Sequence, residues 1–344
     1  MNVTAADHKQ FLQRCYQLAK LSGKQVGTNP LVGAVIVHDG RILAEGRYKM
    51  YGGAHAEVNT LANIKPDNKK LLAQATIYVS LEPCCIYGKT PPCTNALINS
   101  GIKEVHIGAL DPFPGIAGKG VELLKKVGIN VTLHQDGEAE QLISPFVTYH
   151  IKKRPFITLK WAKSKHNFIG KADEQIWLTN KKTNIYTHKL RSQIDAILVG
   201  TNTAILDDPS LTTRHFPGES PLRLTIDLNN RIPLTNRLLS DEEATVLFTT
   251  SKRQLPKHKT QIIVSKETLI KDILGYCYSQ KLVNLMVEGG RKLLDSFLKT
   301  DLWDQAVVIN TEHPLAEGIK APNCHGKLLH EVKFENDLIQ HLSQ

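Results

Sequence analysis

The sequence predicts a two-domain protein of the α/β class. A chain of 344 residues is longer than a single hydrophobic core usually serves. Predicted strands alternate with predicted helices in both halves, which is typical of layered α/β domains. A polar and basic segment that ends in proline, residues 148–155, separates the halves. We therefore expect one domain over residues 1–150 and a second over residues 151–344.

The first half begins with apolar residues at a helical period. Further on, Asp39-Gly40 is a strong hairpin signal between two short apolar runs. A later helix has Thr90 as its expected N-cap, Pro91 at its first position and Gly101 just past its end. The expected strands are 32–37, 41–45, 75–81, 104–109 and 129–133, and the expected helices are 8–22, 55–64, 90–100 and 121–127.

The second half continues the alternation and is large enough to fold as an independent α/β domain. Its expected strands are 156–161, 196–199, 222–227, 245–248, 261–264, 285–287 and 305–309. Its expected helices are 181–191, 268–278 and 291–298.

Composition is ordinary for a globular protein, with 41% apolar and 22% charged residues. No window approaches the ~18 unbroken apolar residues of a membrane helix, and the N-terminus has no basic segment followed by an apolar one. We therefore expect a cytoplasmic protein with no membrane partner. The net charge of +10 is spread thinly along the chain, whereas a continuous nucleic-acid-binding stripe is usually denser. Small anionic ligands fit this mild excess equally well, and we expect no nucleic-acid partner.

Four residues of the first half form a candidate metal centre. His55 and Glu57 belong to a His-Ala-Glu triplet, and Cys84 and Cys93 lie at the two ends of a later loop. One imidazole and two thiolates are three zinc ligands, which leaves the fourth tetrahedral position open, as in catalytic sites. Each residue alone would more often be structural, but the four together indicate a site. Cys85 is expected to be a bystander.

The chemistry that this arrangement predicts is hydrolytic deamination. Zinc lowers the pKa of a bound water toward about 7. Glu57, two residues after His55, is close enough to move protons from the attacking water to the leaving amine without being a ligand. A His-x-Glu triplet followed by Pro-Cys is the signature of zinc deaminases that act on nucleobases.

The loop between the cysteines is longer than in the general signature, in which the second cysteine lies three positions after the first. Position 87 is tyrosine, and the next cysteine follows Gly-Lys-Thr-Pro-Pro at 88–92. This loop, together with Asn-Pro-Leu-Val-Gly at 29–33, Asp111-Pro112 and Gly-Lys-Gly at 118–120, resembles the deaminase of the RibD family of riboflavin biosynthesis.

The resemblance implies a fold and an activity for each half. The first half would be a cytidine-deaminase-like three-layer α/β/α domain, and the second a dihydrofolate-reductase-like α/β domain. The first would deaminate 2,5-diamino-6-ribosylamino-4(3H)-pyrimidinone 5′-phosphate, and the second would use NADPH to reduce the ribosyl group to ribityl. Zn²⁺ and NADPH are therefore the expected cofactors, a small phosphorylated pyrimidine the expected substrate, and a homo-oligomer the expected assembly.

The resemblance also assigns residues of the first half. The zinc ligands would be His55, Cys84 and Cys93, and the proton shuttle would be Glu57. The pyrimidine and phosphate site would include Asn29, Lys89 and Thr90.

Several motifs of the second half carry the same resemblance. They include Leu-Lys-Trp-Ala-Lys-Ser at 159–164, Ile-Trp-Leu-Thr at 176–179, the stretch 195–214 with its Asp-Asp-Pro, and Val-Glu-Gly-Gly at 287–290. A strand that ends in Gly-Gly before a helix lets backbone amides approach a phosphate. The expected cofactor-binding residues are Lys163, Trp177, Thr203, Asp207, Gly289 and Gly290. The expected substrate-binding residues are Gln175, Arg191, Leu211, Arg214 and Glu288, with the two arginines as fixed cations for the substrate phosphate.

The chain departs from the family pattern at three places. The family's Ser-x-Asp-Gly after the first strand of the second half is replaced by Ser-Lys-His-Asn at 164–167. Its Gly-x-His before the zinc helix ends in Tyr48, and its Ser-His after Pro-Cys is replaced by Cys85-Ile86. We expect the changes at Tyr48 and at Cys85-Ile86 to affect substrate affinity more than metal binding. We expect the change at 164–167 to affect the reductase.

Three other functions remain open at this point. The second half could be a degenerate domain that only binds a ligand or holds an oligomer together. The chain could be a nucleic-acid base deaminase of the tRNA type, although the long cysteine loop and thin charge disfavour it. It could also be a non-catalytic zinc protein, but structural zinc sites normally have four protein ligands and the sequence shows three.

Overall fold

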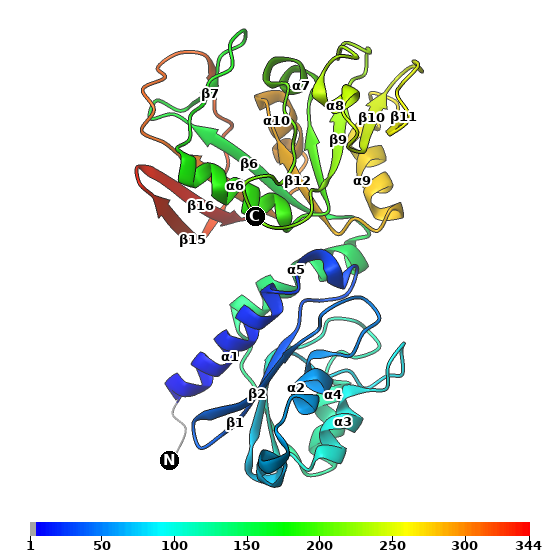
Figure 1. Cartoon of the computed structure of the whole chain (residues 1–344), viewed down its shortest axis with the longest axis vertical. Coiled ribbons are helices and arrows are strands. Elements are labelled where there is room, and N and C mark those ends of the chain that lie inside the picture. Colours follow the sequence, from blue (N-terminus) through cyan, green and yellow to red (C-terminus); the bar gives the residue numbers. More distant parts are fainter. Residues whose placement is uncertain (1–4) are drawn as a thin grey trace. The chain divides into compact units, whose positions relative to one another are not determined.

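The computed structural model describes residues 5–344, which form two compact units (Figure 1). The division falls between Lys152 and Lys153, two residues after the boundary expected from the sequence. Among the helices of residues 5–344, none has both the length and the apolarity needed to cross a bilayer.

The first unit is built on a five-stranded sheet in the order β2-β1-β3-β4-β5. Its strands are β1 (Gly33–His38), β2 (Arg41–Arg47), β3 (Thr76–Leu81), β4 (Glu104–Ala109) and β5 (Asn130–Leu133). The hairpin between β1 and β2 is antiparallel and turns at Asp39 and Gly40, both with positive φ, as the Asp-Gly signal predicts. The pairs β3–β4 and β4–β5 are parallel, so the carboxyl ends of these three strands lie at one edge.

Helices cover both faces of this sheet, giving three layers (Figure 1). On one face, α1 (Ala5–Lys20) packs against α5 (Gly137–Lys152). On the other lie α2 (Ala56–Ala62), α3 (Cys93–Ser100) and α4 (Lys119–Lys126). Two short 3-10 helices, η1 (Gly23–Val26) and η2 (Pro66–Gln74), complete the unit. The buried core joins these layers through residues such as Tyr16, Ile36 and Leu97.

The start of one helix and the existence of another were predicted wrongly in this unit. Helix α3 begins at Cys93 with Pro92 as its N-cap, not at Thr90, because a residue that precedes proline is disfavoured in helical conformation and Pro91 precedes Pro92. Helix α5 was not expected, since the polar residues 148–155 read as a linker. In the structure, Thr148 and Tyr149 are buried, and the helix continues to Lys152.

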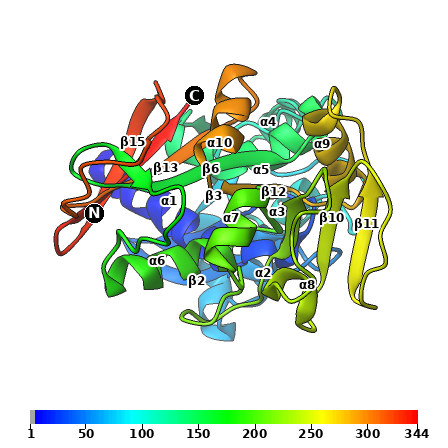
Figure 2. The ribbon, with the colours of Figure 1, turned by 90° about the horizontal axis from the view of Figure 1, so that it is seen from above.

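The second unit contains a nine-stranded sheet in the order β11-β10-β9-β8-β12-β6-β13-β16-β15. The strands are β6 (Phe156–Lys163), β8 (Ala196–Val199), β9 (Leu222–Ile226), β10 (Thr245–Thr249), β11 (Lys259–Ile263), β12 (Asn284–Glu288), β13 (Gln305–Asn310), β15 (Lys327–Phe334) and β16 (Asp337–Ser343). Neighbouring strands are parallel from β11 to β13, and the last two pairs are antiparallel. Figure 2 shows β11 and β15 at opposite ends of this sheet.

The helices of this unit are α6 (Lys181–Ser192), α7 (Thr201–Asp207), α8 (Arg237–Ser240), α9 (Leu269–Ser279) and α10 (Arg291–Lys299). A two-stranded sheet pairs β7 (Phe168–Gly170) with β14 (Ile319–Lys320). The sequence patterns predicted α6, α9 and α10 but missed the shorter helices and β7, β14, β15 and β16. The missed strand β15 has mostly exposed or half-exposed residues, so no apolar run marks it.

Candidate active sites

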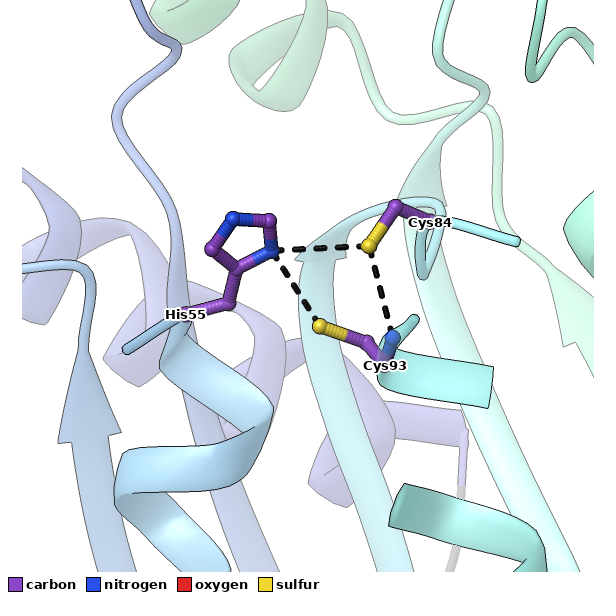
Figure 3. Close-up of side chains that lie close together, drawn as sticks. All are labelled: His55, Cys84 and Cys93. Carbon is purple, nitrogen blue, oxygen red and sulfur yellow. Dashed lines mark hydrogen bonds between the residues drawn. The ribbon is translucent and has the colours of Figure 1, made fainter. Parts of the chain in front are cut away.

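Three separate elements bring the candidate metal ligands together (Figure 3). His55 is the N-cap of α2, Cys93 is the first residue of α3, and Cys84 follows the end of β3 by three positions. The Nδ1 atom of His55 lies 3.5 Å from Sγ of Cys84 and 3.2 Å from Sγ of Cys93. Within residues 5–344, this is the one group of three or more potential ligands whose atoms converge, and it does not include Cys85.

This donor set fits zinc. A tetrahedral ion with Zn–S near ~2.3 Å and Zn–N near ~2.0 Å places sulfur and nitrogen about 3.5 Å apart, close to the two spacings found here. Hydrogen bonding from the Cys93 side chain lowers the pKa of the Cys84 thiol, and the same contact raises the pKa of the Cys93 thiol. The backbone N–H of Cys93 also donates to Cys84 Sγ, at 3.3 Å.

Glu57 lies in the first turn of α2, one position beyond the first residue of that helix. Its side chain is buried, and burial raises the pKa of its carboxyl to about 7. A carboxyl that titrates near neutrality can both accept and donate a proton, which a proton shuttle must do.

A cavity of about 330 Å³ opens beside these residues. The predicted site residues Asn29, His55, Glu57, Cys84, Lys89 and Thr90 line it. Cys93 does not line the cavity, since it is fully buried. The Lys89 ammonium lies 4.1 Å from the centre of the Tyr51 ring, a cation–π contact.

Tyr48, which stands where the family pattern has histidine, is buried and lines the same cavity. Its hydroxyl oxygen accepts the Nδ2–H of Asn29 at 2.7 Å and the backbone N–H of Gly52 at 2.8 Å. Its ring lies edge-on to that of His55, with centroids 5.4 Å apart. Tyr48 therefore connects the Asn29 loop, the Gly52 turn and the metal ligand. The residues around position 48 in the sequence do not indicate these contacts, so the role of Tyr48 was not predicted.

A second cavity, of about 670 Å³, lies in the second unit at the carboxyl ends of β6, β8 and β12. Ligands commonly bind at this edge of parallel α/β sheets. Ten residues predicted for this domain line it: Gln175, Trp177, Arg191, Thr203, Asp207, Leu211, Arg214, Glu288, Gly289 and Gly290. Lys163 does not line it, and its ammonium donates to Oδ1 of Asn167 at 2.8 Å.

The Gly-Gly turn of this cavity fits a phosphate-bearing cofactor. Gly289 has φ of +123°, and a Cβ there would lie 2.8 Å from Oγ1 of Thr203. The same hydroxyl accepts the N–H of Gly290 at 3.0 Å, which holds the turn at the start of α10. Backbone can therefore approach a ligand at a helix N-terminus, the arrangement that suits phosphate. Trp177 lines this cavity and is 67% exposed.

Charged side chains gather on the other wall of the second cavity. Glu288 pairs with Arg191 at 3.0 Å and with Lys160 at 3.8 Å, and all three side chains are nearly buried. Arg214 is different, because no carboxylate within residues 5–344 pairs with it, and burial lowers its pKa. Burial lowers the pKa of the nearby His188 to about 4, so this imidazole is neutral at pH 7.

Lys160 and His188 were missed at the level of sequence. Lys160 lies in β6, and the strand register sets it opposite Glu288 of β12. The sequence could have indicated Lys160, because this lysine lies between the apolar residues Leu159 and Trp161 of a predicted strand. A charged side chain in an interior strand needs a partner of opposite charge.

Comparison with known proteins finds relatives of both units. Residues 5–109 match the family model described as the cytidine and deoxycytidylate deaminase zinc-binding region, and residues 155–336 match the RibD C-terminal domain. The riboflavin biosynthesis protein RibD of Aquifex aeolicus is 39% identical over 345 residues, covering 98% of this chain and 96% of that protein. The RibD of Haemophilus influenzae is 33% identical, covering 87% and 84%.

Solved structures show the same likeness. A diaminohydroxyphosphoribosylaminopyrimidine deaminase/5-amino-6-(5-phosphoribosylamino)uracil reductase from Thermotoga maritima superimposes with a TM-score of 0.87 at 31% identity, covering 98% of this chain and 99% of that one. A structure of Acinetobacter baumannii RibD gives 0.82 at 28% identity, with the same coverage.

These matches define an enzyme that joins a zinc-binding deaminase domain to a reductase domain. The chain belongs to the RibD family of riboflavin biosynthesis proteins. The predicted fold class, with a cytidine-deaminase-like domain followed by a dihydrofolate-reductase-like domain, is confirmed. So are its bifunctional activity, its action on a small pyrimidine, and zinc and NADPH as its cofactors.

Proposed function

We propose that the first cavity deaminates 2,5-diamino-6-ribosylamino-4(3H)-pyrimidinone 5′-phosphate and that the second reduces the ribosyl group of the product with NADPH. The observation that carries this proposal is the convergence of His55, Cys84 and Cys93 beside the buried Glu57, at a cavity that also holds Asn29 and Lys89. The amidine carbon of the proposed substrate would lie beside His55, Cys84, Cys93 and Glu57. Its phosphate would bind the ammonium of Lys89.

Bound zinc would supply an acidified water as nucleophile. Glu57 would accept a proton from that water and return it to the amine as the C–N bond breaks, so that water and amine become carbonyl and ammonia. Asn29, held by the hydroxyl of Tyr48, would fix the pyrimidine through its amide. Lys89 and Thr90 would hold the ribosyl phosphate at the edge of the cavity.

In the second domain, bound NADPH would supply the hydride. The Gly289-Gly290 turn, Thr203, Asp207 and Trp177 are proposed to hold this cofactor. Gln175, Leu211 and Arg214 would hold the substrate, with Arg214 on its phosphate because this cation has no carboxylate partner within residues 5–344. Arg191 and Glu288 would orient the sugar from the opposite wall. The protein's contribution is placement of the carbonyl carbon against the nicotinamide.

The test uses the full chain and separates the two steps. Glu57→Gln should keep zinc and lower ammonia release by at least ~10²-fold. It should leave NADPH oxidation with already deaminated substrate unchanged, because Glu57 lies in the other domain. No ammonia release from the diamino substrate by the wild-type protein would refute the proposed deamination. No NADPH oxidation with its product would refute the reductase and favour a degenerate second domain.

We also propose a homo-oligomer without a nucleic-acid partner, in the cytoplasm. The thin distribution of the +10 net charge supports the second point. Light scattering at several protein concentrations would test the first, and titration with labelled tRNA at low salt would test the second.

A further inference from the structure

One buried carboxylate beside the metal ligands is not used by the proposed reaction. Glu82 directly follows β3 and precedes Pro83 and Cys84, and it is only 3% exposed. Within residues 5–344, every hydrogen-bond partner of its side chain is a backbone N–H. Oε2 accepts from Asp111 at 3.2 Å and Gly118 at 2.9 Å, and Oε1 accepts from Gly120 at 2.9 Å and Val121 at 3.2 Å, so both oxygens are fully used.

Three of these donors form the start of α4. Gly118 is the N-cap of that helix, and Gly120 and Val121 lie in its first turn, where N–H groups have no partner inside the helix. A carboxylate at this end is also favoured by the helix dipole. The contact is tight, because a Cβ on Gly120 would overlap the carbonyl oxygen of Pro83. Glu82 thus fastens α4 directly to the segment that carries Cys84.

The fourth donor, Asp111, belongs to the loop between β4 and α4. This loop supplies Asp111, Phe113 and Ile116 to the wall of the deaminase cavity. The loop has a bond to Glu82 at each of its ends, at Asp111 and at Gly118. One carboxylate therefore sets the position of this wall relative to the cysteine ligand two residues away.

We propose that Glu82 is a positioning residue for the deaminase, holding the loop 110–118 and the start of α4 against the strand end that bears Cys84. The inference rests on the proposed deamination in this cavity. Glutamine at this position would keep one acceptor oxygen but turn an NH₂ group toward two backbone donors. The wall would move, whereas the three metal ligands would be unchanged. Substrate binding is then affected before zinc binding.

The experiment compares the wild-type chain with two variants, Glu82→Gln and Gly120→Ala. The second variant disrupts the contact between Glu82 and α4 by adding a Cβ to the helix. Asp227→Asn is the matched control. Asp227 is also fully buried and accepts two backbone N–H bonds, from Arg231 at 2.8 Å and Ile232 at 2.9 Å, but it lies in the other domain. Zinc content, the KM and kcat of ammonia release, and amide hydrogen exchange over residues 110–121 are measured.

Both deaminase variants should retain zinc, raise KM on the order of 10-fold with a smaller change in kcat, and speed exchange in residues 110–121. The control should change none of these. An unchanged KM in both variants overturns the proposal, and so does loss of zinc from both, since Glu82 would then support the ligands. If the wild-type protein releases no ammonia, the proposed function fails instead, and exchange alone decides whether Glu82 holds the loop.

Discussion

Replacing Glu288 by glutamine should destabilise the reductase domain by several kcal/mol. The Glu288 carboxylate lies between the guanidinium of Arg191 and the ammonium of Lys160. The three side chains are only 11–13% exposed, so solvent screens them little. Removing the carboxylate leaves two buried cations without an anion, which typically costs about 3–5 kcal/mol.

The pKa of Glu288 gives a second estimate of this magnitude. Burial alone would raise that pKa, but the charges of Arg191 and Lys160 outweigh burial and lower it from 4.5 to about 2. The difference corresponds to about 3 kcal/mol. Because the folded-state pKa is lowered, this stabilisation is fully present above pH 4.5 and is lost as the pH falls toward 2. The stability difference between wild type and Glu288→Gln should therefore shrink over that window.

Tryptophan fluorescence during urea unfolding measures the effect in the intact chain. All three tryptophans, at positions 161, 177 and 303, lie in the second unit, so their signal reports that unit alone. Glu312→Gln is the matched control, because its pair with Lys165 is well exposed and should change stability by less than about 0.5 kcal/mol. A loss below about 1 kcal/mol at pH 7 would contradict the reasoning, as would a loss that stays constant down to pH 3.

Three further outcomes are expected. Cys93→Ser should lose zinc on dialysis and Cys85→Ser should retain it, as measured by metal analysis; the reverse pattern would show that the ligands are misassigned. Arg214→Ala should raise the KM for the reductase substrate by at least ~10-fold while NADPH binding, followed by fluorescence titration, is unchanged. Tyr48→Phe leaves the Asn29 amide and the Gly52 N–H without their acceptor, so the deaminase KM should rise by about 5–100-fold; an unchanged KM would remove Tyr48 from the substrate site.

The metal centre was predictable because its signals are local. His55 and Glu57 are two positions apart, and the loop from Cys84 to Cys93 has a distinctive length and composition. The Asp39-Gly40 turn and the apolar strands of both sheets could also be predicted, because their signals lie within short stretches of sequence. Even here a local rule misplaced a boundary: Thr90 and Pro91 read as a helix start, yet Pro92 delays α3 until Cys93. That shift places the ligand at the first helical position.

Contacts between distant segments could not be predicted. Tyr48 meets Asn29 across 19 positions, and Glu82 meets Val121 across 39. Glu288 meets Arg191 across 97 positions, and its strand neighbour Lys160 comes from a different part of the chain. Nothing near any of these residues in the sequence specifies the partner. Each pairing follows from sheet register and from the folding of loops over the cavity.

In the second cavity, two arginines that the sequence assigned to the same role have different hydrogen-bond and ion-pair partners. Arg191 and Arg214 were both expected to hold the substrate phosphate. In the structure, the charge of Arg191 is compensated by Glu288, whereas Arg214 donates to the hydroxyl of Thr212. A phosphate that approached Arg191 would have to compete with a carboxylate 3.0 Å away. At Arg214 it would meet an exposed cation whose pKa is lowered by partial desolvation and by the charges of Arg191 and Arg237. We therefore propose that the phosphate binds at Arg214, where an anion would offset the repulsion from the neighbouring cations, and that Arg191 orients the sugar through Glu288.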